Sequence, residues 1–301
     1  MTQAPHVVLE LTLKRGTESA RGWASEDLPP KWFTKNPDSD FRDDVVGMVD
    51  VIAHATAVAP TLAAPTAFDL WWQLHESQKR WARANGVPGL LAGLGTALVE
   101  RALIDAACRL DGLSFDEAIM SGTLGFESQR VHPELEHQSL DEAFSGRGGN
   151  ELSIRHTVGL SDPLTDDEVV DDPADGLPVS LDAVIARYGV DHFKIKTKGD
   201  LSADISRIRR ILELAPAHKI EPWFTIDGNE SMTSAAHFTR WARGLLDEPG
   251  LSDVLSERLI AVEQPFHRSM ALSDEAGGAL RAMRSRLAVI IDESDCDVTT
   301  V

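Results

Sequence analysis

The chain has 301 residues, 43% hydrophobic and 26% charged, which is the composition of a soluble globular protein with room for one large domain or two ordinary ones. Its formal net charge of −19 argues against nucleic acid or an anionic membrane as a partner, because both are negatively charged. Two cysteines, Cys108 and Cys296, are too few for a disulfide framework or a cysteine-rich zinc site, and Cys108 is expected to be a small buried hydrophobe. No apolar run approaches the roughly 18 to 20 residues that span a bilayer, and the N-terminus lacks the pattern of a secretory signal. We therefore expect a cytoplasmic protein.

The first third of the chain is predicted to be α+β. An apolar, β-rich run from His6 to Leu13 and a second run at Arg21–Ala24 indicate a hairpin. Residues 25–42, rich in Pro, Asp and Ser, indicate a loop, and a helical region is predicted over 43–124. One helix there has its apolar residues at i, i+3, i+4 and i+7, namely Val99, Ala102, Leu103 and Ala106. The polar residues 127–150 then predict a linker or an insertion.

Beyond residue 150 the pattern changes to strands that alternate with amphipathic helices. This alternation predicts parallel strands joined by crossover helices, and therefore an α/β fold. The strand candidates are Leu152–Leu160, His192–Lys196, Trp223–Asp227, Leu259–Glu263 and Leu287–Asp292. The apolar helix faces between them are Ile205, Ile208 and Leu212, then Phe238, Trp241 and Leu245, then Ala276, Leu280 and Met283.

A (β/α) barrel needs about eight strands, whereas five are visible here. The fifth would leave an apolar edge at Leu287–Asp292, and open apolar edges aggregate or recruit another strand. We therefore expect the natural protein to continue with further β-α units. We expect residues 1–301 alone to be poorly soluble or to form a homo-oligomer.

Three predicted strands end in a carboxylate directly after an apolar run: Asp227 in WFTID, Glu263 in LIAVE and Asp292 in LAVIID. Singly, each acid is typical of a helix N-cap or a solvated residue. Together they indicate a site, because the C-terminal ends of barrel strands converge on one rim. Three carboxylates there need a counter-charge, and a hard cation such as Mg²⁺ prefers oxygen ligands. Further polar residues beside these acids are Asn229, Glu230 and Glu293.

The second of these strands carries two lysines on one face. Lys194 and Lys196 share strand parity, while Phe193 and Ile195 point to the other side. A solvated strand face is the alternative interpretation, because Lys198 continues the same parity. Beside a metal cluster, a lysine with a lowered pKa can act as a general base near neutral pH.

Four short motifs on successive strands resemble the enolase superfamily, of the mandelate racemase and muconate-lactonizing type. They are Lys-x-Lys at 194–196, Asp-Gly-Asn at 227–229, Glu-Gln-Pro at 263–265 and Asp-Glu-Ser at 292–294. The last motif is similar to that of the muconate-lactonizing subgroup, and the match covers about residues 150–296. The Gly-Trp-Ala strand and the Ala-rich helix at 102–107 resemble the family's capping domain more weakly.

The resemblance implies a domain order as well as an activity. It implies an α+β capping domain over 1–126, the linker or insertion at 127–150, and the first five or so strands of a TIM-like barrel over 151–301. The family removes a proton α to a carboxylate through an enediolate, as racemases or epimerases, cycloisomerases or dehydratases. The implied enzyme is an isomerase or a lyase that acts on a small-molecule carboxylate.

Carried over by motif, Asp227, Glu263 and Asp292 would be the Mg²⁺ ligands. Lys196 would abstract the proton, and Lys194 would support it or the substrate carboxylate. A divalent cation with nearby ammonium groups stabilises the charge that develops when the α-proton leaves. Such a metal-plus-base site is also the general description of enolase-superfamily chemistry.

The resemblance implies two further parts that have no counterpart in this sequence. One is a second acid/base, commonly a lysine, on a later strand. The other is a first N-terminal strand with a loop that covers the substrate. We therefore expect the chain as written to be inactive in racemisation.

Two alternatives from other classes stay open. A class I aldolase or a pyridoxal-phosphate barrel also places a lysine at a strand end, although neither needs three strand-end carboxylates. The second alternative is a truncated or degenerate relative that binds a metal without catalysis. The loop aromatics Trp32 and Phe33 either cover the pocket or pack on their own domain.

Overall fold

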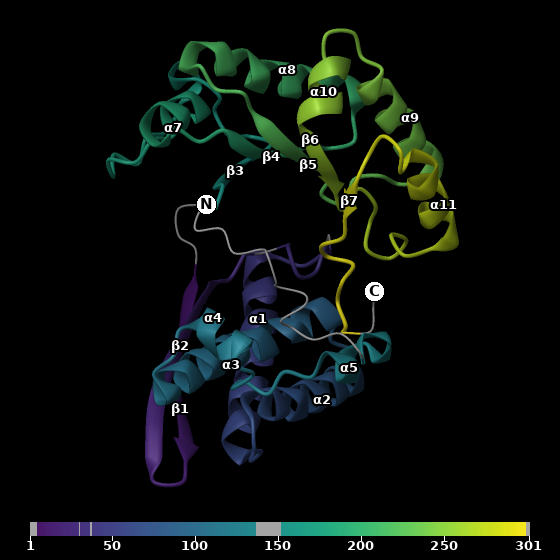
Figure 1. Ribbon diagram of the computed structural model, residues 1–301. Helices are drawn as coiled ribbons and strands as arrows, with labels where there is room; N and C mark the ends of the chain where they lie inside the picture. Colours follow the sequence, from purple (N-terminus) through teal and green to yellow (C-terminus); the bar gives the residue numbers. More distant parts are fainter. Residues whose placement is uncertain (1–4, 30, 37, 137–151, 299–301) are drawn as a thin grey trace. The chain divides into compact units, whose positions relative to one another are not determined.

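The computed structural model describes residues 5–29, 31–36, 38–136 and 152–298 (Figure 1). The described residues fall into two compact units, which we name the helical unit (Met1–Gly148 with Asp295–Val301) and the parallel-sheet unit (Gly149–Ser294). The predicted linker over 127–150 and the start of the barrel at 151 stay predictions, because residues 137–151 lie outside the described residues. No helix in the described ranges combines the length and the apolar character that crossing a membrane requires.

The helical unit begins with the predicted hairpin. Strand β1 (His6–Arg15) pairs antiparallel with β2 (Glu18–Asp27) around Gly16, whose φ of 63° suits a tight turn. Helix α1 begins at Phe41, because Asp40 accepts hydrogen bonds from the N–H groups of Arg42 and Asp43. The predicted loop over 25–42 is therefore shorter than expected at both ends. The helices are α1 (Phe41–Val58), α2 (Ala67–Asn85), α3 (Gly89–Asp111), α4 (Phe115–Met120) and α5 (Ser128–Val131), with single turns at Ala59–Thr61 and Pro133–Leu135.

Close backbone approaches hold this unit together. A Cβ atom at Gly22 on β2 would lie 2.1 Å from the carbonyl oxygen of Ala102 on α3. A Cβ atom at Gly95 on α3 would lie 2.2 Å from the carbonyl oxygen of Val51 on α1. The predicted inner face of α3 is buried, as is Cys108, whose thiol pKa is raised by burial.

The aromatic pair of the loop packs within the helical unit. Phe33 is buried in its apolar core, and Trp32 packs against the same core with its ring edge-on to Phe33 at 4.7 Å. Of the two alternatives for this pair, the structure supports packing on its own domain.

The parallel-sheet unit contains five parallel strands in the order β3-β4-β5-β6-β7. The strands are β3 (Arg155–Val158), β4 (His192–Lys196), β5 (Trp223–Asp227), β6 (Leu259–Glu263) and β7 (Val289–Ile290). The helices are α7 (Leu181–Tyr188), α8 (Leu201–His218), α9 (Ala235–Leu246), α10 (Ser252–Arg258) and α11 (Asp274–Met283), with a single turn at Asp166–Glu168. The fold class predicted from the sequence is confirmed: α+β elements followed by a barrel-like β/α sheet.

The helices of this unit lie on one side of the curved sheet (Figure 1). The side chains of Phe193 and Ile195 join their apolar core and are almost fully buried. Lys194 and Lys196 have the opposite strand parity and therefore lie on the other, inner face.

The two outer strands are shorter than predicted. After Val158 the chain turns away, and the N–H of Gly159 donates to the carboxylate of Asp162 at 2.6 Å. After Ile290 the N–H of Asp292 donates to the side chain of Gln264 at 2.8 Å. Side chains thus accept hydrogen bonds from backbone N–H groups that a longer strand would pair with its neighbour. The strands predicted over Leu152–Leu160 and Leu287–Asp292 are therefore wrong at their ends.

Candidate active site

Three of the predicted site residues lie in one row across the ends of neighbouring strands. Lys196 on β4 is in register with Asp227 on β5, which is in register with Glu263 on β6. Each is the last residue of its strand. Their side chains therefore share one face at one end of the sheet, as the sequence pattern predicts.

The lysines and carboxylates of this row are in contact. The Lys196 ammonium donates to Asp227 at 2.6 Å. The Lys194 ammonium lies 3.0 Å from Asp227 and 2.5 Å from Glu263, so it bridges the two carboxylates. Asp227 and Glu263 are buried. The alternative of a solvated lysine face is therefore wrong for these two lysines, although Lys198, beyond the end of β4, is exposed.

The carboxylates do not cap helices. Helix α9 is capped by Ser234 and helix α11 by Ser273. Asp227 instead accepts a hydrogen bond from the N–H of Asn229 at 2.7 Å, which fixes its carboxylate beside Lys196. The N-cap interpretation is therefore wrong for Asp227 and Glu263.

Asp292 lies beside Glu263, two residues beyond the short strand β7. Burial and the neighbouring carboxylate of Glu263 raise the pKa of Asp292, and Lys194 opposes this shift. The structure thus brings all three predicted carboxylates together around Lys194.

The charges in the row set the protonation of its members. Burial favours the neutral form of Asp227, but the ammonium groups of Lys196 and Lys194 outweigh it and hold the pKa of Asp227 below its usual range. Burial also lowers the pKa of Lys194, yet its hydrogen bonds to Glu263 and Asp227 outweigh this effect and leave the pKa raised. In this arrangement the positive charge of Lys194 pairs with both carboxylates.

The auxiliary residues have different places. The Oδ1 atom of Asn229 accepts a bond from Lys196 at 3.4 Å, so Asn229 adjoins the row. Glu230 pairs with the guanidinium of Arg268 at 2.9 Å, so it anchors the loop after β5. Glu293 is buried next to Asp292 in the chain.

Sequence reasoning missed Arg155, the first residue of β3. Its guanidinium donates to the hydroxyl of Thr225 at 3.0 Å and lies 3.9 Å from the carboxylate of Glu263. The available signal was parity, since Thr157, two residues later, is in register with Lys194. Arg155 adds a third positive charge on the same face of the sheet.

The donor set suits a hard divalent cation in its chemistry. Asp227 and Glu263 flank Lys194, Asp292 lies beside Glu263, and the Oε2 atom of Glu263 is buried without a hydrogen-bond partner. Carboxylate oxygens are the ligands that Mg²⁺ prefers. As the side chains stand, however, no group of three or more His, Cys, Asp or Glu residues in the described part of the chain is arranged to hold a metal. The ammonium of Lys194 lies between Asp227 and Glu263 in this arrangement.

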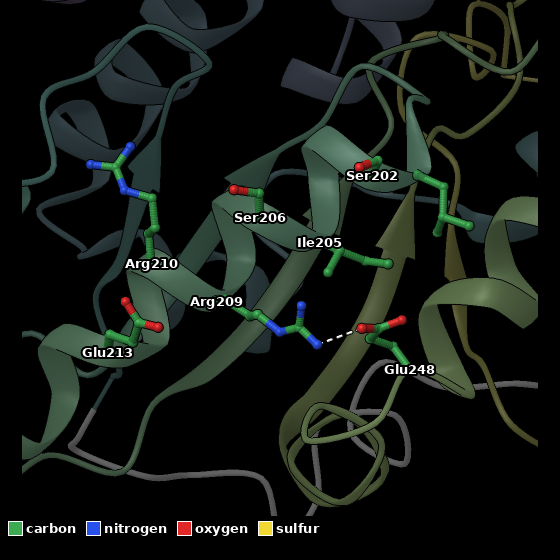
Figure 2. A pocket seen from close by; sticks show the side chains of 8 residues that line it. Ser202, Ile205, Ser206, Arg209, Arg210, Glu213 and Glu248 are labelled. Atoms are coloured by element: carbon green, nitrogen blue, oxygen red, sulfur yellow. Dashed lines mark hydrogen bonds and ion pairs between the residues drawn. The ribbon is translucent and has the colours of Figure 1, made fainter.

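A hollow of the parallel-sheet unit lies away from this row. It has a volume of about 610 Å³ and runs along α8, where Arg209 reaches across to pair with Glu248 (Figure 2). No residue of the strand-end row lines it. We assign no chemistry to this hollow, because its only charged groups near the opening are arginines and glutamates of the outer helix surface.

Comparisons with known proteins give similarity in structure. Neither a scan against protein-family models nor a search of curated proteins gives a match. A mandelate racemase/muconate lactonizing protein from Herpetosiphon aurantiacus matches with a TM-score of 0.50 and 18% identity, over 96% of this chain and 66% of that one. A mandelate racemase/muconate lactonizing enzyme from Roseiflexus sp. matches with a TM-score of 0.50 and 19% identity, over 97% of this chain and 67% of that one.

The chain has the mandelate racemase/muconate-lactonizing fold. It spans about two thirds of the length of those two proteins. The resemblance drawn from the four motifs is thereby confirmed at the level of the fold.

Proposed function

We propose that the protein is an enzyme of the enolase superfamily that removes a proton α to a carboxylate, with Mg²⁺ as its cofactor. The observation that carries the proposal is the row of Lys196, Asp227 and Glu263 at adjacent strand ends, with Asp292 beside Glu263. Such a row is expensive to bury unless its charges are paired or used. The fold shared with mandelate racemase/muconate lactonizing proteins supports the same chemistry.

In this proposal Asp227, Glu263 and Asp292 hold the cation. When bound, Mg²⁺ supplies positive charge that stabilises the enediolate relative to the substrate carboxylate. Lys196 accepts the α-proton at its Nζ atom, in the free amine form. Asn229 and Asp227 orient that Nζ atom through the contacts they already make with it.

Lys194 has a separate part. Its ammonium lies between Asp227 and Glu263 in this structure, and in the proposed enzyme it binds the carboxylate of the substrate. A Schiff-base role for Lys194 would need the neutral amine instead.

The test is hydrogen–deuterium exchange of α-protons in D₂O, followed by NMR over a panel of small carboxylates with and without Mg²⁺. We expect Mg²⁺-dependent exchange in the natural protein, its loss in Lys196→Ala, and unchanged Mg²⁺ affinity in that variant. Asp227→Asn should weaken Mg²⁺ binding first. A non-catalytic relative would bind Mg²⁺ without exchanging the α-proton of any carboxylate. Loss of Mg²⁺ binding in Lys196→Ala would contradict the assignment of Lys196 as the base.

A further inference from the structure

Gln264 connects the chain at Glu263 with the chain at Asp292, and the proposed function gives Gln264 itself no chemical role. It follows Glu263 directly and is 2% exposed. Its φ of 35° is in the left-handed region, which residues other than Gly rarely adopt. A strained, buried polar residue persists only where its surroundings hold it in place.

The side-chain amide of Gln264 is held by four hydrogen bonds. Its Oε1 atom accepts from the N–H of Asp292 at 2.8 Å and from the N–H of Ser294 at 3.3 Å. Its Nε2 atom donates to the carbonyl oxygen of Phe266 at 2.9 Å and to the hydroxyl of Ser294 at 2.6 Å. Both ends of the amide are thus used according to their donor and acceptor character, which fixes its orientation.

Three of these bonds run to the segment that follows β7. This strand has only two residues, and its backbone is paired to β6 through the N–H of Gln264, which donates to the carbonyl oxygen of Ile290 at 2.9 Å. Beyond Ile290, where the strand has ended, hydrogen bonds to the Gln264 side chain connect this segment to the end of β6. The position of Asp292 next to Glu263 therefore depends on one side chain rather than on a β-ladder.

We propose that Gln264 is a positioning residue that sets the carboxylate of Asp292 against that of Glu263. The backbone part of this proposal stands on the four hydrogen bonds, and its consequence for the cation rests on the proposed function. By connecting the end of β6 to the segment after β7, Gln264 keeps the carboxylates of Glu263 and Asp292 next to each other.

The experiment compares Gln264→Asn with the natural sequence. Asn keeps the amide but is one methylene shorter, so it loses its reach to the Asp292 N–H. Hydrogen exchange of the cation-free protein, read by mass spectrometry on a peptide covering 288–296, should become about tenfold faster, as expected for loss of a local hydrogen-bonded connection. The peptide covering β6 is the internal control and should not change.

Gln264→Glu is the intermediate variant. Its carboxylate keeps an acceptor for the N–H groups of Asp292 and Ser294 but cannot donate to the carbonyl oxygen of Phe266, so exchange of peptide 288–296 should lie between that of Gln264→Asn and that of the natural sequence. If Gln264→Asn leaves the exchange of this peptide unchanged, or speeds up the β6 peptide equally, the positioning role is overturned.

The consequence for the site is measured with Mn²⁺ as the probe, by calorimetric titration. Gln264→Asn should lower Mn²⁺ affinity by about 10- to 100-fold, the usual effect of removing a group that orients a metal ligand. Gln73→Asn, at an exposed position of α2, is the matched control and should leave the Mn²⁺ affinity unchanged. If only peptide 288–296 loosens while affinity holds, Gln264 does not position a ligand.

Asp292→Asn separates the two proposals. It should abolish tight Mn²⁺ binding if Asp292 is a ligand. If it does not, the metal site of the proposed function fails, and the exchange result on peptide 288–296 still decides whether Gln264 holds this segment.

Discussion

The two units are built on opposite principles. In the helical unit, Gly22 and Gly95 let backbones approach closely, and the helices and the hairpin share a mainly apolar core. In the parallel-sheet unit, helices cover one face with an apolar core, while the other face carries a row of lysines and carboxylates. Tight apolar packing contributes stability, whereas buried charges cost free energy unless they are paired. The buried charges therefore make the inner sheet face the candidate site.

The largest effect is expected from breaking the charged row. Asp227→Asn leaves the ammonium groups of Lys194 and Lys196 with one carboxylate fewer, so the free energy of unfolding should fall by about 3–5 kcal/mol in chemical denaturation. The control is Glu221→Gln, because Glu221 pairs with Arg258 while its side chain is 76% exposed. Loss of that pair should cost at most about 1 kcal/mol. Equal losses of stability in the two variants would contradict the claim that the buried row contributes more to stability than an exposed ion pair.

The next effect tests the packing of the helical unit. Gly95→Ala would place a Cβ atom 2.2 Å from the carbonyl oxygen of Val51, so α1 and α3 must separate. The free energy of unfolding should fall by about 3 kcal/mol. Gly93→Ala on the same helix meets nothing within 4 Å and should instead raise stability by about 0.5–1 kcal/mol. Thermal unfolding followed by circular dichroism measures the stability of both variants. Equal changes in the two would contradict the importance of the close approach at Gly95.

The smallest effect concerns pH. Asp204 is buried and accepts bonds from the N–H groups of Lys198 and Gly199 and from the indole of Trp241 at 2.9 Å. Burial nevertheless leaves the pKa of Asp204 raised. A raised folded-state pKa means that protonation stabilises the fold, so this contribution is present at low pH and is lost as pH rises through the folded pKa.

Relative to Asp204→Asn, the natural protein should therefore gain stability as pH falls from 7 towards the unfolded-state pKa of 3.8. The gain should be about 1.4 kcal/mol for each unit by which the pKa is raised. Denaturant unfolding of both proteins at several pH values measures it. A difference that stays constant, or that grows with rising pH, contradicts the assigned direction.

The sequence predicts the central strands better than the outer ones. The bounds of β4, β5 and β6 agree with the predicted runs, because β5 and β6 are apolar, β4 alternates apolar with charged residues, and each ends at a charged residue. The end of β3 is followed by a local turn in which the N–H of Gly159 donates to Asp162, whereas the segment after β7 depends on a bond to Gln264, 28 positions away in the sequence. Local sequence therefore fixes the central strands, and at β7 a contact distant in the sequence takes over where the strand stops.

The site shows the same division. Strand parity and motif order predict that Lys194, Lys196, Asp227 and Glu263 share one face. Arg155 escapes such reasoning, because its contact with Thr225 joins residues 70 positions apart and depends on strand register. The expected cytoplasmic setting, the homo-oligomer and the second acid/base remain predictions from the sequence.

The central claim is that Asp227, Glu263 and Asp292 hold one divalent cation with Lys196 facing it. Anomalous diffraction from crystals of the natural protein soaked in Mn²⁺ tests it most directly. The account predicts one strong peak within about 2.0–2.2 Å of an oxygen atom of each carboxylate, with the Lys196 Nζ atom outside the coordination shell. A peak held by other residues would contradict it. So would the absence of bound Mn²⁺ at millimolar concentration, with the Lys194 ammonium still between Asp227 and Glu263.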